Sequence, residues 1–220
     1  MSRRSLVDLP PPRPVLWALR SPDTARSSFE ILGDGRRRIV IRHAELKGVR
    51  PEMLRWWYHN VLGEMDYAGG RWPRYLVWHP LDHISYRIVR AASGGGVGPG
   101  ARLHIREAFQ RKPDNLLDVT VTVERIDAAA AIIANRILGL SALRLVNSFE
   151  ATATGTRYVS EMVIGSDSLA GRLGLNRLAR GLILPGAKAE AWARHHIEEV
   201  GNLENFLPAL YAAEMSGKEN

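Results

Sequence analysis

The sequence predicts an α+β protein in which a curved antiparallel β-sheet wraps around a long C-terminal helix, the helix-grip arrangement. Several runs between residues 26 and 164 alternate apolar and polar side chains, as strands with one buried face do. Beyond residue 167 the apolar spacing becomes helical and stays so to about residue 207. No internal repeat or low-complexity boundary divides the chain, so we expect a single domain, with a cavity between sheet and helix.

The composition is that of a soluble globular protein. Of the 220 residues, 45% are hydrophobic and 24% are charged, and no apolar run reaches the roughly 18–20 residues of a membrane helix. Near the N-terminus, basic residues are followed by prolines between Pro10 and Pro14, where a signal peptide would need an apolar stretch. A cytoplasmic protein without a membrane partner is therefore expected. The absence of cysteine excludes disulfides, thiolate zinc sites and a cysteine nucleophile.

The net charge of +7 raises the question of a nucleic-acid partner. The 30 Lys and Arg residues are dispersed, and their densest cluster, Arg36–Arg38, lies in an expected hairpin turn. Neither an RNA-binding signature nor a zinc finger accompanies them. We therefore expect no nucleic-acid binding, and a field that attracts acidic or phenolic ligands.

The first part of the chain is expected to hold an arm, a hairpin and a helix. Residues 1–25 form an irregular, Pro-rich arm. Two β-like runs, 28–32 and 38–46, flank a Gly-Asp-Gly sequence that is typical of a hairpin turn. Pro51 suits the first position of a helix, and Gly63 is placed to end it.

The second part of the chain is expected to hold most of the strands. Residues 75–79 are expected to be extended, and Pro80 ends this segment. Further strands are predicted at 83–90, 102–109, 116–126, 142–152 and 156–164. Residues 128–140 stay ambiguous, because Ala favours helix and the paired Ile favours strand. Helices are predicted over 168–182 and from 187 to about 207. The helix-grip domain is thus expected to span 26–213, with a frayed tail at 214–220.

Residues 53–83 are unusually rich in aromatic rings and imidazoles. This stretch holds four of the six Trp, three of the six Tyr and three of the seven His. An aromatic core and a ligand pocket explain that density equally well. The residues predicted to line a substrate pocket are Trp56, Trp57, His59 and Trp78. Trp56 and Trp57 are adjacent in one helix, so at least one of them should serve packing instead.

Candidate metal ligands occur on the last helix and on one strand. His195 and Glu199 are four residues apart, so both side chains lie on one helix face and could bind one cation, although ordinary surface pairs share this spacing. Glu107 alternates in phase with Leu103 and Ile105 and should face inward. A buried carboxylate is costly unless a metal or an inward Arg compensates it.

A second histidine is available from the segment around Pro80. His79 and His83 flank Pro80-Leu81-Asp82, and either one would complete a set of two His and two carboxylates. Such a set suits Zn²⁺, Fe²⁺ or Mn²⁺. Asp82 could orient a neighbouring imidazole as a hydrogen-bond acceptor.

Four sequence elements together resemble the diacetylphloroglucinol hydrolase family, which includes phloretin hydrolases. They are MLRWWYHN, RYLVWHPLDHI, the Glu of LHIREAF and HHIEEVGNLENFLPALY, and the resemblance spans about residues 51–211. It implies a START-like helix-grip fold and a metal-dependent hydrolase that cleaves the carbon–carbon bond between an acyl group and a phenolic ring. The implied zinc ligands are Glu107, His195, Glu199 and either His79 or His83.

The choice of histidine changes what the resemblance implies for the substrate. With His83 as the ligand, Tyr75 stands where the family has a substrate-contacting Tyr. With His79 as the ligand, Asp82 stands where the family has a substrate-contacting amide. Relative to the best-known family members, this chain is expected to lack much of their N-terminal region, so the resemblance does not imply the identity of the substrate.

The leading hypothesis is hydrolysis of an acylated phenol. The metal would polarise the acyl carbonyl and lower the pKa of water, while Tyr75, Asp82 or the non-ligating histidine moves protons. The expected partner is a small phenolic ketone, and a homodimer is left open. One alternative is a carrier of an aromatic polyketide or lipid that binds no metal. Another is a polyketide cyclase or dehydratase that uses His and Asp as acid and base.

Overall fold

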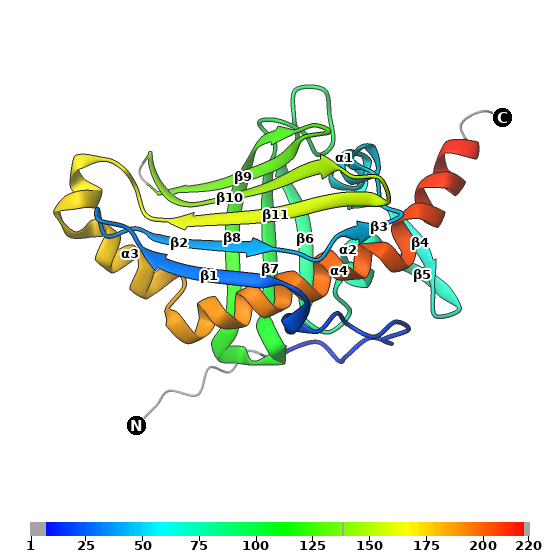
Figure 1. The fold of residues 1–220 in the computed structure, drawn as a ribbon, viewed down its shortest axis with the longest axis horizontal. Helices are drawn as coiled ribbons and strands as arrows, with labels where there is room; N and C mark the ends of the chain where they lie inside the picture. Colours follow the sequence, from blue (N-terminus) through cyan, green and yellow to red (C-terminus); the bar gives the residue numbers. More distant parts are fainter. Residues whose placement is uncertain (1–7, 138, 218–220) are drawn as a thin grey trace.

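The main feature of the computed structural model, which describes residues 8–137 and 139–217, is a curved antiparallel sheet. The strand order is β1-β2-β11-β10-β9-β8-β7-β6, and the short β3 pairs with β11. The bounds are β1 (Arg26–Ile31), β2 (Arg37–Arg42), β3 (Leu46–Lys47), β6 (His83–Arg90), β7 (Arg102–Ala108), β8 (Leu116–Ile126), β9 (Ala130–Ile137), β10 (Leu140–Ala151) and β11 (Gly155–Ile164). In Figure 1, β1, β2 and β9–β11 run across the view, whereas β6–β8 run steeply, so the sheet curls around a long helix, α4 (Gly186–Ser216).

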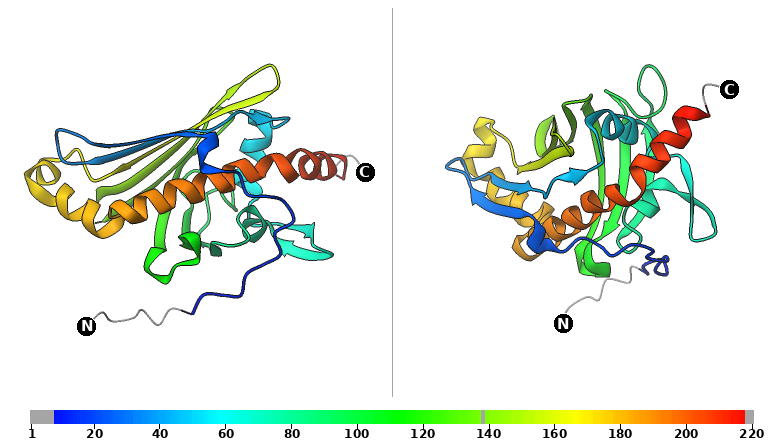
Figure 2. Two further views of the ribbon diagram at one scale, coloured as in Figure 1. Left: turned by 60° about the horizontal axis from the view of Figure 1, so that its bottom comes forward. Right: turned by 45° about the vertical axis from the view of Figure 1, so that its right-hand side comes forward.

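The remaining elements cover the two ends of this sheet. They are α1 (Pro51–Asn60), the hairpin β4 (Glu64–Tyr67) and β5 (Gly70–Pro73), α2 (Arg74–Trp78), a π-type turn at Gly171–Leu175, α3 (Asn176–Ile183), and short 3₁₀ turns at Pro22–Thr24, Phe109–Arg111 and Pro113–Asn115. Figure 2 shows α3 beside the N-terminal end of α4, and α1, α2 and the hairpin beside its C-terminal half. The architecture is the predicted α+β, START-like helix-grip arrangement.

Three elements differ from the sequence-based expectation or resolve it. Residues 75–79, expected to be extended, lie mostly in α2, whose last carbonyls at Val77 and Trp78 accept hydrogen bonds from the Asn202 side chain of α4 at 3.1 and 3.0 Å. The ambiguous segment contains strand β9, which pairs with β8 on one side and β10 on the other. Helix α4 continues to Ser216 through Pro208, beyond its expected end near residue 207. Tertiary contacts therefore decide the conformation of residues 75–79 and of β9, where local propensity is weak.

The core consists of two apolar clusters along α4. One lies under α1 and α2 and includes Trp57 and Leu203, and the other lies under the N-terminal half of α4 and includes Trp192 and Ile197. Between these clusters, the middle of α4 carries several buried polar side chains. Within the described ranges, no helix combines the length and the apolar character needed to cross a membrane.

Candidate metal centre

Four buried side chains from three elements converge on one point. They are His83 of β6, Glu107 of β7, and His195 and Glu199 of α4. The His83 Nε2 atom lies 3.6 Å from Glu107 Oε1 and 3.2 Å from Glu199 Oε2. The His195 Nε2 atom lies 3.7 Å from Glu107 Oε2 and 3.8 Å from Glu199 Oε2. Both imidazoles therefore direct the same nitrogen at the same two carboxylates.

Backbone pairing explains how the strands bring these residues together. His83 is directly opposite Glu107 in the β6–β7 ladder, so the two side chains share a face of the sheet. The register shifts between His83 and Ser85, and Tyr86 then pairs with Ile105. This irregularity breaks the two-residue alternation and places His83 and Tyr86 on the same face.

The other ring nitrogen of each histidine is already hydrogen-bonded. His83 Nδ1 donates to the Tyr75 carbonyl at 2.6 Å, and His195 Nδ1 donates to Asp82 Oδ2 at 3.1 Å. The Nε2 atoms of His83 and His195 are buried and have no hydrogen-bond partner among the described residues. In the neutral rings, each Nε2 therefore presents a free lone pair, as metal-binding histidines do.

The charge of the cluster also calls for a cation. The side chains of Glu107 and Glu199 are buried, and within the described part of the chain each of their ion pairs is to a histidine, not to Arg or Lys. Two buried carboxylates without such a partner are costly, and a divalent ion would neutralise both. Bonds of about 2.0–2.2 Å would place tetrahedral ligands about 3.3–3.6 Å apart, close to the separations found here. The donor set and its spacing fit a metal ion.

The pKa values of the metal-free site follow from the same charges. Burial lowers the pKa of His195, but the hydrogen bond to Asp82 and the charges of Glu107 and Glu199 outweigh burial and raise it to about 9. Burial raises the pKa of Glu199, but the charge and hydrogen bond of His196 outweigh it, so this pKa lies well below its usual range. The His195 imidazole therefore holds a proton at neutral pH, and a metal bound at its Nε2 atom would replace that proton.

Asp82 holds His195 from the side away from the carboxylates. Its two oxygens accept hydrogen bonds from the backbone N–H groups of Gln110 at 2.9 Å and Arg111 at 3.1 Å, in addition to His195 Nδ1. Burial alone would raise the pKa of Asp82, but the bond to His195 and the charge of His79 outweigh it and lower the pKa to about 2. Asp82 is therefore ionised and holds His195 through a hydrogen bond, and it does not line the cavity described below.

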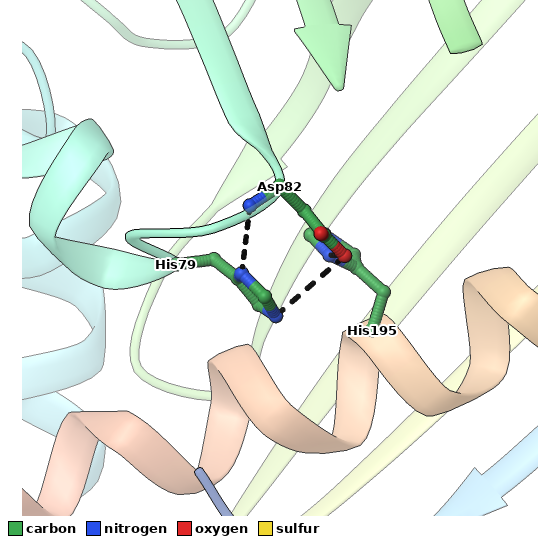
Figure 3. Close-up of side chains that lie close together, drawn as sticks. All are labelled: His79, Asp82 and His195. Carbon is green, nitrogen blue, oxygen red and sulfur yellow. Dashed lines mark hydrogen bonds and ion pairs between the residues drawn. The ribbon is translucent and has the colours of Figure 1, made fainter. Parts of the chain in front are cut away.

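His79 belongs to a second group of potential ligands, with Asp82 and His195 (Figure 3). Its Nδ1 accepts the Asp82 backbone N–H at 3.1 Å, and its Nε2 donates to Glu198 Oε2 at 3.1 Å. Both nitrogens of His79 thus have protein partners, unlike the Nε2 atoms of His83 and His195. This second group is a satisfied hydrogen-bond network, and its chemistry fits a metal less well than the cluster around His83.

A cavity of about 100 Å³ lies between the sheet and α4 and contacts the cluster. Glu107 and Glu199 reach it, and its other lining residues are Tyr58, Val61, Tyr75, Trp78, Tyr86, Ile105, Leu117, Val119, Val121, Ile133, Leu143, Leu145, Asn147, Met162, Trp192 and His196. The Tyr75 ring stacks on His83 with centroids 3.9 Å apart, and its hydroxyl donates to Glu107. Burial and the charge of Glu107 raise the pKa of Tyr75, so this hydroxyl keeps its proton.

Three of the four residues predicted to line a substrate pocket lie elsewhere. Trp56 packs against Tyr211 and under the Arg74 guanidinium, and Trp57 is fully buried against Trp78 and Phe206. His59 Nδ1 contacts the Val97 carbonyl at 2.7 Å. Trp78 does line the cavity. Of the four, Trp78 alone lines this cavity in the described part of the chain, because α1 turns the other three side chains toward α4 or toward the loop before β7.

Sequence reasoning missed several residues that do reach the cavity. Tyr58 of α1 stands three positions before Val61, the residue that caps the end of this helix, and this spacing places both on one side. Asn147 alternates in phase with Leu143 and Leu145 on β10, which marks it as an inward polar residue. Its Nδ2 donates to Tyr58 Oη at 3.2 Å, and its Oδ1 faces His196 Nε2 at 3.3 Å. Both signals were available in the sequence.

Replacing Asp82 with Asn is expected to weaken metal binding by about 10–100-fold, because the hydrogen-bond acceptor of a ligating histidine tunes its orientation and basicity. Competition with a coloured chelator measures this change in Kd. Asp66→Asn is the matched control, since Asp66 is an exposed β4 residue paired with Arg71. Unchanged affinity in Asp82→Asn would mean that Asp82 does not support a metal ligand.

A curved sheet, a long helix across it and a buried two-His, two-Glu cluster beside an aromatic cavity define a START-like helix-grip protein with a candidate metal centre. The chain belongs to the DAPG hydrolase family: the model of the DAPG hydrolase PhiG domain matches residues 20–212. The predicted family is thereby confirmed, and membership supports a hydrolase. Among curated protein sequences, none matches this chain.

Several solved structures are similar to this one at low sequence identity. Protein NE0264 from Nitrosomonas europaea is 12% identical, with 80% of this chain and 97% of that chain covered and a TM-score of 0.45. Protein Ms6760 from Mycobacterium smegmatis is 14% identical, with 78% and 94% covered and a TM-score of 0.42. A putative uncharacterized protein from Rhizobium leguminosarum is 18% identical, with 83% and 97% covered and a TM-score of 0.40.

Proposed function

We propose that this protein is a metal-dependent hydrolase that cleaves the carbon–carbon bond between an acyl group and a phenolic ring. One observation carries the proposal: two buried imidazole nitrogens without partners among the described residues, on His83 and His195, face the carboxylates of Glu107 and Glu199 beside an aromatic cavity. Family membership supports hydrolysis as the type of reaction that such a site would serve.

In this proposal His83, Glu107, His195 and Glu199 hold the metal, with Zn²⁺ as the expected ion. A divalent ion at this place would act as a Lewis acid toward an acyl carbonyl and would lower the pKa of nearby water. The protein fixes the two histidines through the Tyr75 carbonyl and the Asp82 carboxylate. It fixes Glu199 through His196, which in turn contacts Ser160 Oγ at 2.7 Å.

The reaction balances with one water molecule and the acylated phenol. The bond between the ring carbon and the acyl carbon breaks, the acyl carbon gains hydroxyl to become a carboxylic acid, and the ring carbon gains a proton. Tyr75 is the residue best placed to handle a proton of the phenol, because its protonated hydroxyl lies in the cavity and contacts Glu107. The apolar walls exclude bulk water from the ring.

The size of the cavity restricts the acyl group. A volume of about 100 Å³ is smaller than the roughly 150 Å³ of an apolar cavity that holds benzene, so even one substituted ring requires the lining side chains to move apart. A short acyl group demands less movement than an arylpropanoyl group. We therefore propose short-chain acylphloroglucinols as the preferred substrates.

Elemental analysis of protein purified without added metal, combined with an assay for the released acid, tests this function. We expect about one divalent ion per chain, release of acetate from an acetylphloroglucinol, and loss of activity on chelation that the added ion restores. A phloretin-type substrate should react more slowly. Metal-free protein that binds the phenol without hydrolysing it would contradict the proposal and favour a carrier.

A further inference from the structure

One surface segment exposes a group of leucines that the fold does not cover. Five of them, here called the leucine face, are Leu169, Leu173, Leu175, Leu178 and Leu182, and their exposed fractions are 72%, 79%, 48%, 58% and 72%. On α3 and its first flanking residue, Leu175, Leu178 and Leu182 follow the three- and four-residue spacing of one helix side. Five large exposed apolar side chains within 14 residues are more than scattered surface leucines and are typical of an interaction site.

Polar contacts on the inner side hold this segment in place. The buried Asn176 side chain donates to the carbonyls of Asp34 at 2.8 Å and Ser166 at 3.0 Å, and it accepts the Ser166 N–H at 2.8 Å. Arg180 donates to the Gly35 carbonyl at 3.0 Å. Because Asn176 anchors α3 to the β1–β2 turn and to the end of β11, the leucines stay directed outward.

The segment is basic as well as apolar. From residue 168 to residue 188 the sequence contains four cationic side chains and neither Asp nor Glu. A hollow of about 240 Å³ opens beside Leu173, and Arg172 and Arg177 line it together with the β1–β2 turn. The acidic residue of this hollow, Asp34, already pairs with Arg36 at 2.7 Å. Arg172 Nε donates to the carbonyl of Asp167, the residue directly before this segment, at 3.1 Å. The hollow therefore offers the remaining N–H groups of Arg172, together with Arg177, to an anionic group.

We propose that the leucine face, with Arg172 and Arg177, binds the surface of an anionic phospholipid bilayer. The leucines would enter the boundary between headgroups and acyl chains, and the arginines would contact the phosphates, as in interfacial basic amphipathic helices. A second copy of the chain fits less well, because a two-fold contact would bring the arginines of both copies together without intervening acids in the segment. The site is distinct from the candidate metal centre.

Sedimentation with lipid vesicles tests the proposal. We expect the full-length protein to sediment with vesicles that contain phosphatidylglycerol, more weakly as salt rises, and not with pure phosphatidylcholine vesicles. Arg172→Gln/Arg177→Gln should lower the partition coefficient roughly ten- to thirtyfold. Leu178→Ser/Leu182→Ser should lower it on the order of tenfold. Arg90→Gln/Arg102→Gln, on exposed strand positions of β6 and β7, is the matched control and should bind as the wild type does.

A dye that reports polarity locates the contact. The chain has no cysteine, so Leu173→Cys and Val89→Cys each provide a single labelling position. Anionic vesicles should shift the emission of the dye at residue 173 to the blue and leave the dye at residue 89 unchanged. Equal binding to neutral and anionic vesicles, or no binding, would overturn the proposal. A concentration-dependent dimer that the leucine variants dissociate would instead identify a second copy as the occupant.

Discussion

Replacing His83 with Gln is expected to reduce bound metal from about one ion per chain to less than about a tenth. The same substitution at His79 should leave the metal content near one. The difference follows from the contacts of the two rings: His83 Nε2 faces Glu107 and Glu199, whereas both nitrogens of His79 already contact Glu198 and the Asp82 backbone. Removing one of the four protein ligands leaves one coordination position of the ion without a protein donor, which weakens binding.

Metal content should be measured by elemental analysis after gel filtration, together with circular dichroism to confirm that both variants are folded. Activity should follow metal content, so His83→Gln should be inactive. Full metal content in His83→Gln and its loss in His79→Gln would assign the ligand to His79 and overturn this arrangement. Loss in both variants with intact folding would mean that His79 contributes through its stacking on His195, whose ring centroid lies 4.4 Å away.

Tyr75→Phe is expected to lower the turnover of an acylphloroglucinol by about 10²–10⁴-fold without loss of metal. The substitution removes the hydroxyl that contacts Glu107 and keeps the ring that stacks on His83. A positioned proton donor or acceptor typically contributes an effect of this size. Steady-state rates, with elemental analysis of the same preparation, measure both quantities.

Tyr67→Phe is the matched control for this experiment. The Tyr67 hydroxyl also donates a hydrogen bond, to the Pro14 carbonyl, but it lies outside the cavity. This variant should retain wild-type turnover. A Tyr75→Phe enzyme that turns over at the wild-type rate would exclude proton transfer by Tyr75 and leave it a role in packing.

Much of the fold and three of the four residues of the candidate metal centre could be predicted from local patterns. Side-chain alternation at Leu103, Ile105 and Glu107 predicts an inward carboxylate, and Glu107 is buried on that face. The four-residue spacing of His195 and Glu199 predicts one helix face, and both side chains point at the cluster. These predictions succeed because each depends only on the period of one regular element.

Tertiary structure alone decided the residues that lie outside such periods. The His79–His83 segment leaves a short helix, turns at Pro80 and enters β6 through a register shift, so no repeat in the sequence tells which imidazole faces Glu107. Trp56 and Trp57 look equally suited to a pocket and to a core until α1 is docked on α4. The sequence by itself determined the sheet, the long helix and three of the four converging side chains. The orientation of the fourth, His83, depends on how segments distant in the sequence pack together. The segment before it is irregular, so no repeating period fixes where its side chains point.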